Sequence, residues 1–428
     1  MTIDSQATRR YKVVGTSPVR HDGVDKVTGT ALYGADLRLP AMLFGQVLRS
    51  PHAHARIKSI DVSKAEAHPH VKAVATSNDI HPSAPVSKDV IIGQVPPENI
   101  FARKKVFYRG HPVAAVAATS LHDAEQALSL IHVDYEPLPA VTNGEDAMVS
   151  GAPILHEHWT DDEGRGTNVA AHDEHRFGDI EEGFRDADVV MEREFRTKTV
   201  HQGYIEPQNA TAMWTHDGCL TVWCSSQGHF GVRDNTARIL GMSVSNVKIV
   251  PMEIGGGFGG KLPVYLEPVA AVLAKKSARP VKMAMSRAEV LEATGPTCGS
   301  YIRIKMGATE EGRIIAAQAY FVFEAGAFPG APLIQGAASV FAPYYLENVV
   351  VEGYDVVDNK PKTTAYRAPG APIVAYAAES LMDELAERLR IDPVEFRLLN
   401  VAVEGTRRAD GVMNGCIGAK EVMEAVKA

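Results

Sequence analysis

Five glycines fall within seven residues, in the segment Gly255–Lys261 with the sequence GGGFGGK. This segment directly follows the strand-like run VKIVPMEI. Because glycine has no Cβ atom, such a run lets the backbone approach a ligand closely and adopt left-handed conformations. Successive backbone N–H groups can then converge on an oxyanion or a phosphate. We therefore expect a fold in which a strand delivers this glycine loop to a ligand.

Two nucleotide-binding motifs match the glycine loop only in part. Gly255, Gly257 and Gly260 satisfy the GxGxxG pattern, but Leu262-Pro263 delays the helix that a dinucleotide-binding unit needs. The loop also fits the start of a P-loop, yet Leu262 stands where a magnesium-binding Ser or Thr is required. A nucleotide-binding enzyme remains an alternative, as does a glycine-rich turn that serves close packing alone.

The composition narrows the class of protein. A chain of 428 residues suggests two or three domains, and a net charge of -8 without a strongly basic stretch argues against a nucleic-acid partner. Cys219 and Cys224 lack the CxxC spacing of a zinc or iron–sulfur site, and Cys298 and Cys416 stand alone. The first residues lack the apolar core of a signal peptide, and no membrane-spanning apolar run is present. We therefore expect a cytoplasmic protein.

The pattern along the chain indicates an α+β protein. We expect an N-terminal arm over residues 1–20, a small α/β domain over 21–140, a linker over 141–175 and a larger mixed α/β domain over 176–428. The linker is inferred from a segment rich in Gly, Asp, Glu and His, which we expect to lie over a surface.

Alternating and apolar runs predict the individual elements. A helix capped by Asp123 is expected in the small domain. Further helices are expected at GVRDNTARILG, LEPVAAVLAKKS, PIVAYAAESLMDELAERLR and VEFRLLNV. Strands are expected at LFGQVLRS, ARIKSIDV, VKAVATS, PVAAVAATS, HVDYEPLPA, VVMEREFRTKTV, LTVWCSS, VKIVPMEI and YIRIKMGA.

Four motifs stand in a fixed order along the chain: VHQGYIEPQNATA, CSSQ ending at Gln227, the glycine loop, and TTAYRAPGAP containing Arg367. In this order they resemble the large subunits of the xanthine dehydrogenase and aldehyde oxidase family of molybdenum hydroxylases. Phe258 follows Gln227 by 31 positions, a separation that suits the family. Upstream, DKVTGTALYGADLRLPAMLFGQVLRSPHAHARI resembles the family's opening hammerhead domain. The helical segment ESLMDELAERLRIDPVEFRLLN is also similar to the family.

The resemblance implies a hammerhead-like domain followed by the first molybdopterin-binding domain. In this family the pterin dithiolene holds the metal, so the protein supplies outer-sphere contacts and no direct ligand. Gln227, Phe258 and Arg367 are the expected contacts to the molybdenum ligands. Gly256, Gly257 and Gly259 are expected to join them in binding molybdenum–molybdopterin, in its plain or cytosine dinucleotide form.

Two of these residues have implied catalytic roles. The neutral amide of Gln227 can donate to an oxygen ligand of the metal without competing as a ligand itself. The permanent charge of Arg367 can stabilise negative charge that develops during attack on an electron-poor carbon. Taken singly, Gln227 would be an ordinary edge-strand residue and Arg367 a surface arginine.

Other polar residues have structural interpretations. Glu206, followed by Pro207 at a strand end, is expected to be structural rather than a general base. His111 is expected to be a hydrogen-bonded residue of the small domain. His52, His54 and His70 lack the convergent spacing of a metal site.

The family's large subunit continues into a second cofactor-binding domain that carries a catalytic glutamate, and this chain has no matching residue. Nicotinate dehydrogenases of the family divide the molybdenum subunit in this way. The resemblance therefore implies an enzyme that is active only with partners: a second molybdopterin subunit supplying the general base, an FAD subunit and a subunit with [2Fe-2S] clusters.

Two departures from the family limit the substrate. Leu262 stands where purine-oxidising members carry a glutamate, and Ala368 and Pro369 stand where carbon monoxide dehydrogenases place a cysteine. What remains is oxidation of an N-heteroaromatic compound or of an aldehyde with water-derived oxygen, and the split architecture favours the N-heteroaromatic compound. The alternatives are an aldehyde-oxidising member of the family and, from another class, a non-catalytic scaffold subunit.

Overall fold

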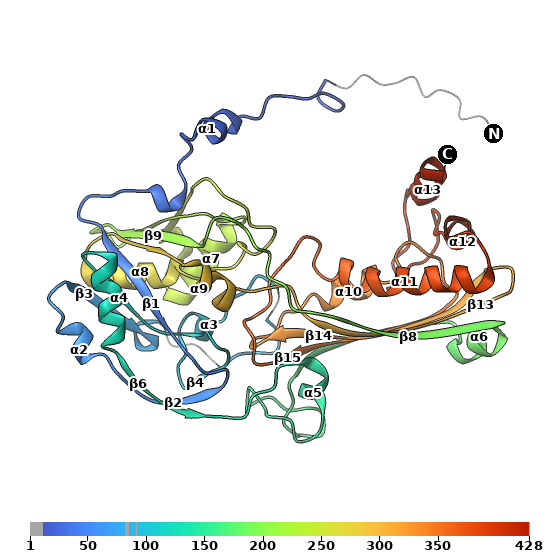
Figure 1. Ribbon diagram of the computed structural model, residues 1–428, viewed down its shortest axis with the longest axis horizontal. Coiled ribbons are helices and arrows are strands. Elements are labelled where there is room, and N and C mark those ends of the chain that lie inside the picture. The colour runs from blue at the N-terminus through green and yellow to red at the C-terminus, as the bar shows by residue number, and fades with distance from the viewer. Residues whose placement is uncertain (1–11, 82–84, 91, 428) are drawn as a thin grey trace.

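The computed structural model describes residues 12–81, 85–90 and 92–427, and two large β-sheets lie toward opposite ends of an elongated molecule (Figure 1). Of the expected N-terminal arm, residues 1–11 lie outside the described residues. Residues 12–20 contain no helix or strand, and the first helix is α1 (Gly23–Thr28).

The first sheet has seven strands in the order β11-β10-β9-β12-β1-β5-β3. β1 (Leu43–Arg49) pairs in parallel with β12 (Val281–Ala284), so a strand of the expected small domain continues the sheet of the large one. The division near residue 140 is therefore not a division between sheets. The other strands are β3 (Val71–Thr76), β5 (Pro112–Ala118), β9 (Asn209–Trp214), β10 (Leu220–Cys224) and β11 (Val247–Pro251).

Helix α8 (Glu267–Ser277) packs against β9 and β3, and its residues from Glu267 to Ala274 are all buried. A helix that is apolar nearly all round is stable only when it is enclosed, which explains this central position. α7 (His229–Leu240) packs beside α8. α4 (Leu121–Ser129) buries Ala124 and Ala127 against the same sheet.

A three-stranded sheet in the order β4-β2-β6 lies within residues 21–140, the expected small domain. Its apolar face packs on a small core that includes Ala55, Val106 and Val113. The strands are β2 (Ala55–Asp61), β4 (Lys105–Val106) and β6 (His132–Pro137). Short helices in this half are α2 (Ser63–Glu66), α3 (Pro97–Ile100) and α9 (Arg287–Ala293).

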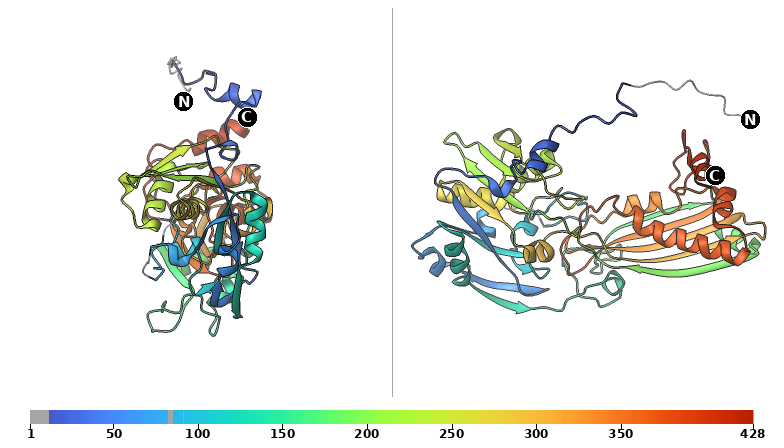
Figure 2. Two further views of the ribbon diagram at one scale, coloured as in Figure 1. Left: turned by 90° about the vertical axis from the view of Figure 1, so that its left-hand side faces the viewer. Right: turned by 45° about the horizontal axis from the view of Figure 1, so that its top comes forward.

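The second large sheet has five strands in the order β7-β15-β14-β13-β8. α10 (Leu333–Ser339) and α11 (Ala371–Leu389) cover one face of it (Figure 2). α11 buries residues at helical spacing, such as Val374, Ala378, Leu381 and Leu385, against the strands. The strands are β7 (Val169–Phe177), β8 (Val189–Thr197), β13 (Ser300–Ala308), β14 (Ile314–Gly326) and β15 (Asn348–Val357). The remaining helices are α5 (Gly144–Met148), α6 (Ile180–Asp186), α12 (Pro393–Asn400) and α13 (Ala419–Lys427).

The segment 141–175 differs from the linker that we expected. It contains α5 and most of β7, which pairs with β15. Leu155, His156 and Trp159 are buried within it. These side chains have no regular spacing, so periodicity cannot reveal that this segment packs into the core around the five-stranded sheet.

The cap of α4 is a second correction. The side chain of Ser120, rather than Asp123, accepts the backbone N–H of the first turn, and that N–H belongs to Asp123 itself. The helix therefore begins three residues earlier than a cap at Asp123 would imply, at Leu121.

The α+β assignment is confirmed, and all nine expected strands are present. β4, β7, β9, β12, β14 and β15 were not expected, although β14 and β15 form the centre of the second sheet. In the described part of the chain no helix is both long and apolar enough to cross a membrane.

Candidate functional site

Gln227 lies between β10 and α7, where the chain turns toward the glycine loop. Its side-chain Oε1 accepts the backbone N–H of Gly259 at 2.7 Å and that of Lys261 at 3.2 Å. Its own backbone N–H donates to the carbonyl of Lys261 at 3.0 Å. Gln227 is exposed, and its amide oxygen already accepts two N–H groups of the loop. The side-chain N–H₂ therefore remains available to donate to another group.

The glycine loop follows β11 and needs its glycines for conformation and for close approach. Gly256 and Gly259 have φ angles of 93° and 106°, which residues with a Cβ atom rarely adopt. A Cβ on Gly257 would lie 2.5 Å from Oε1 of Gln227, and one on Gly259 would lie 2.4 Å from the carbonyl oxygen of Ala365. The loop is thus pressed between two other segments of the chain.

Three consecutive N–H groups of this loop have no hydrogen-bond acceptor among the described residues. Within the described residues, the backbone N–H groups of Gly256, Gly257 and Phe258 donate no hydrogen bond. Phe258 has a φ of 51°, and its side chain is 47% exposed. Neighbouring backbone donors of this kind form a concavity that suits an anionic group.

The Arg367 loop precedes α11 and touches the glycine loop directly. The backbone N–H of Arg367 donates to the carbonyl of Phe258 at 2.9 Å. Arg367 and Ala368 both have left-handed conformations, with φ of 35° and 65°, which cost energy and persist only where the surroundings hold them. The amide of Gln202 holds this segment through a 2.9 Å bond to the carbonyl of Ala365. Arg367 is an exposed residue.

The structure therefore brings together the residues singled out in the sequence. Gln227, the loop from Gly256 to Gly259, and Arg367 are linked by direct hydrogen bonds, although they lie far apart in sequence. The site offers a neutral amide donor, unused backbone N–H groups and a nearby arginine. These groups fit an anionic pterin cofactor that needs no protein ligand to its metal.

Glu206 has no free carboxylate for proton transfer. Its Oε2 accepts from the backbone N–H of Gly255 and from the Nζ of Lys261, each at 2.7 Å, and its Oε1 accepts from Asn209 at 3.0 Å. The expected structural role is confirmed. Sequence reasoning missed Lys261, whose pKa is lowered by burial.

A cavity of about 380 Å³ adjoins the Arg367 loop. Of its described lining residues, only Lys198 and Arg367 are charged, and Tyr366, Val200 and Pro372 contribute apolar surface. Cys298 also lines it, but burial raises the pKa of this thiol far above its usual range. The thiol therefore stays protonated and unreactive.

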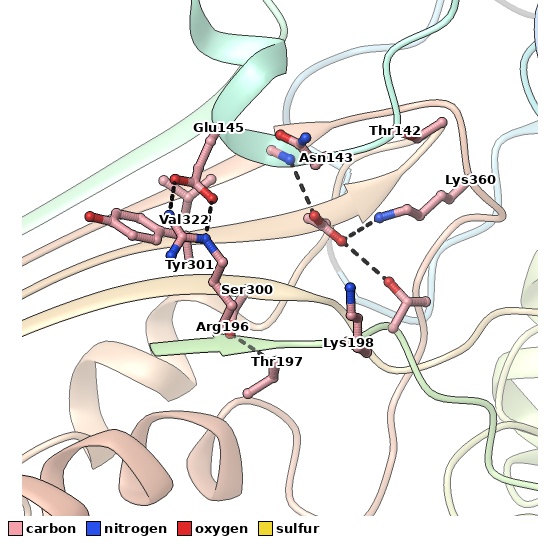
Figure 3. A pocket seen from close by; sticks show the side chains of 13 residues that line it. Thr142, Asn143, Glu145, Arg196, Thr197, Lys198, Ser300, Tyr301, Val322 and Lys360 are labelled. Carbon is pink, nitrogen blue, oxygen red and sulfur yellow. Dashed lines mark hydrogen bonds and ion pairs between the residues drawn. The ribbon is translucent and has the colours of Figure 1, made fainter. Parts of the chain in front are cut away.

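A second cavity, of about 450 Å³, lies at the ends of β8, β13 and β14 beside α5 (Figure 3). Its charged side chains are largely paired with one another: Arg196 with Glu145, and Lys360 with Glu324. Lys198 lines this cavity as well as the first. The pairing leaves little uncompensated charge for a ligand.

His111 is hydrogen-bonded within its own part of the chain. His111 is buried, and its ring accepts from the N–H of Phe107 at 3.2 Å and contacts the carbonyl of Glu98 at 2.8 Å, as expected for a satisfied residue. Across the residues the structure describes, no group of three or more His, Cys, Asp or Glu side chains is arranged to hold a metal ion.

Two protein families match the chain. Residues 28–139 match the a/b hammerhead domain of aldehyde oxidase and xanthine dehydrogenase. Residues 161–401 match the molybdopterin cofactor-binding domain. The second match contains Gln227, the glycine loop and Arg367.

Two relatives are similar over nearly the whole of this chain. The nicotinate dehydrogenase large molybdopterin subunit of Eubacterium barkeri is 32% identical over 97% of this chain and 96% of its own length. The carbon monoxide dehydrogenase large chain of Afipia carboxidovorans is 32% identical over 92% of this chain, but only 51% of its own length is covered.

Solved structures agree. Quinoline 2-oxidoreductase from Pseudomonas putida 86 superposes with a TM-score of 0.87 at 26% identity, covering 98% of this chain and 54% of that one. The aldehyde oxidoreductase from Desulfovibrio gigas gives 0.86 at 28% identity, over 95% of this chain and 45% of that one. The chain thus spans about half the length of several proteins that it matches.

The order of the two domain families, the near full-length similarity to a named molybdopterin subunit and the shared fold all agree. The chain therefore belongs to the xanthine dehydrogenase and aldehyde oxidase family, as a molybdopterin-binding subunit of a molybdenum hydroxylase.

Proposed function

We propose that this chain is the larger molybdopterin subunit of a split molybdenum hydroxylase that oxidises an N-heteroaromatic compound. The observation that carries the proposal is the contact of Gln227, the glycine loop and Arg367 at one exposed surface. Full-length similarity to a nicotinate dehydrogenase large molybdopterin subunit supports it.

The cofactor would be bound by backbone and amide donors. The N–H groups of Gly256, Gly257 and Phe258 and the side-chain N–H₂ of Gln227 would hold its anionic groups. Arg367 would stabilise negative charge that develops beside it. The bound cofactor, in its plain or cytosine dinucleotide form, would supply the two-electron oxidation of carbon with oxygen from water.

The proposed partners are a second molybdopterin subunit, an FAD subunit and a subunit with [2Fe-2S] clusters. The second molybdopterin subunit would supply the general base, since the carboxylate of Glu206 is already used by Gly255, Asn209 and Lys261. Exposed apolar side chains border the glycine loop and suit such a partner: Ile205 is 88% exposed, Phe230 76% and Leu262 37%.

The substrate is proposed to be a flat, electron-poor ring. Leu262 and Phe258 give the loop an apolar border where a purine would require a carboxylate. Quinoline 2-oxidoreductase, one of the matched structures, is named for such a substrate. An aldehyde is the second candidate, because aldehyde oxidoreductases match the fold equally well.

Native purification through a tag on this chain tests the proposal. Molybdenum and pterin near one per chain, with a smaller molybdopterin subunit and flavin and iron–sulfur partners, is the expected result. The purified complex is then assayed with nicotinate, quinoline and a series of aldehydes. A complex that assembles fully but carries no molybdenum under adequate metal supply would favour a scaffold subunit instead.

A further inference from the structure

A buried ion pair lies directly behind the glycine loop. The Nζ of Lys261 and Oε2 of Glu206 are 2.7 Å apart, and the two side chains are only 1% and 10% exposed. The same Nζ donates to Oγ of Ser225 at 3.3 Å and lies 5.0 Å from the centre of the Tyr204 ring. The ammonium group is therefore enclosed by partners of this chain and cannot reach a ligand in this arrangement.

Glu206 holds the loop at both of its ends. Its Oε2 accepts the backbone N–H of Gly255, the first residue of the loop, at 2.7 Å. The same oxygen pairs with Lys261, the last residue of the loop. In addition, the backbone N–H of Glu206 donates to the carbonyl of Gly255 at 3.1 Å. One carboxylate thus fixes the separation of the two ends.

Lys261 also joins this ion pair to Gln227. Its side chain pairs with Glu206, while its backbone N–H donates to Oε1 of Gln227 and its carbonyl accepts from the backbone of Gln227. A shift of Lys261 would therefore move the amide of Gln227 together with the loop. The three residues form one unit even though only Gln227 faces outward.

A loop of five glycines has many conformations available, and the cost of ordering it must be met by contacts elsewhere. A buried ion pair is a poor source of net stability, because removing two charges from water offsets most of their attraction. Such a pair is better suited to selecting one arrangement among several, as a buried polar group does when it fixes register. Its place at both ends of the loop fits that use.

We infer that Glu206 and Lys261 are positioning residues that hold the glycine loop and Gln227 in the one arrangement that binds the cofactor, without touching the cofactor themselves. This inference rests on the proposed function for the identity of the ligand. The arrangement of the loop can nevertheless be measured without any ligand.

The test compares variants of the natively purified complex by hydrogen–deuterium exchange and by molybdenum and pterin content. In Lys261→Met, exchange in peptides covering residues 252–266 is expected to rise at least tenfold, and the cofactor content to fall at least threefold. Peptides from β13 and β14 should be unchanged. Lys360→Met is the matched control, since Lys360 forms a partly buried ion pair with Glu324, a residue of β14 in the five-stranded sheet. It should lower the melting temperature without changing loop exchange or cofactor content.

The double variant Glu206→Leu with Lys261→Met separates positioning from stability. It removes both charges, so thermal stability should recover relative to Lys261→Met alone, while loop exchange and cofactor content stay altered because Gly255 has lost its acceptor. A double variant with a protected loop and full cofactor content would overturn the inference. If the wild-type complex holds no molybdenum, the proposed function fails, but loop exchange still decides whether the ion pair positions the loop.

Discussion

The amide oxygen of Gln227 accepts the backbone N–H of Gly259 at 2.7 Å, across 32 positions of sequence. The bond fixes which end of the amide faces outward, because the oxygen also accepts from Lys261. It makes Gln227 an anchor of the glycine loop and leaves its side-chain N–H₂ as the donor that we propose for the bound cofactor. Substitutions can separate these two roles.

Gln227→Glu keeps an oxygen for Gly259 and Lys261 but replaces the outward N–H₂ with a second oxygen. We expect near-normal cofactor content and a fall in kcat of about 10- to 100-fold, the usual range for loss of an outer-sphere contact. Gln227→Ala removes the anchor as well, and should lower cofactor content in addition. Steady-state kinetics and metal analysis on the purified complex distinguish the two. Equal cofactor loss in both variants would argue against separate roles.

Gly259→Ala tests the close approach of the two loops. The added Cβ would lie 2.4 Å from the carbonyl oxygen of Ala365, and the φ of 106° is unfavourable for alanine. We expect a destabilisation of at least about 2 kcal/mol, with the Arg367 loop displaced. Gly231→Ala is the control, because Gly231 lies in α7 with nothing within 4 Å. It should be neutral or stabilising by about 0.5–1 kcal/mol. Chemical denaturation measures both.

Much of the site was predictable because its residues form contiguous motifs in a fixed order. Gln227, the glycine loop and Arg367 were all located from sequence, and the structure brings them into contact. The pairing of Lys261 with Glu206 was not predictable, because it joins residues 55 positions apart and depends on burial. The only local signal was a lysine that ends a glycine run and precedes an apolar residue.

The missed parts of the fold have two different physical causes. β14 and β15 are buried at the centre of a sheet with a helix layer on one face, so their runs, such as IIAAQAYFVFEAG, lack a strict polar alternation. A continuous apolar run of this kind does not distinguish a strand from a buried helix. The segment around Trp159 was missed for the opposite reason, since its buried residues have no regular spacing.

The apolar residues beside the glycine loop should contact the second molybdopterin subunit. Ile205→Asp and Phe230→Asp each place a charge on a side chain that is 88% or 76% exposed in this chain. Since burying an unpaired charge is costly, we expect at least a tenfold loss of the second subunit in co-purification. Leu121→Asp, at the start of α4 and 47% exposed, is the control and should have no effect. Retention of the partner in both test variants would place its interface elsewhere.

The stability of the chain should fall in mild acid because of two buried histidines. Burial lowers the pKa of His111 and of His156 to about 4. In the unfolded chain a histidine titrates near 6.5, so between pH 6.5 and 4 the unfolded state binds protons that the folded state does not. The stabilising contribution is therefore complete above pH 6.5 and is lost as the pH falls toward 4. Between pH 7.5 and 5 each histidine accounts for about 2 kcal/mol.

His111→Gln removes one of these protons while keeping a donor for the carbonyl of Glu98 and an acceptor for the N–H of Phe107. The variant should lose about half of the pH dependence that the two histidines cause together, and the slopes of the two stability curves should differ most near pH 5. Urea unfolding at a series of pH values measures this. A parallel displacement of the whole curve, with its slope unchanged, would mean that His111 is not the titrating group, because a packing defect alone lowers stability equally at every pH.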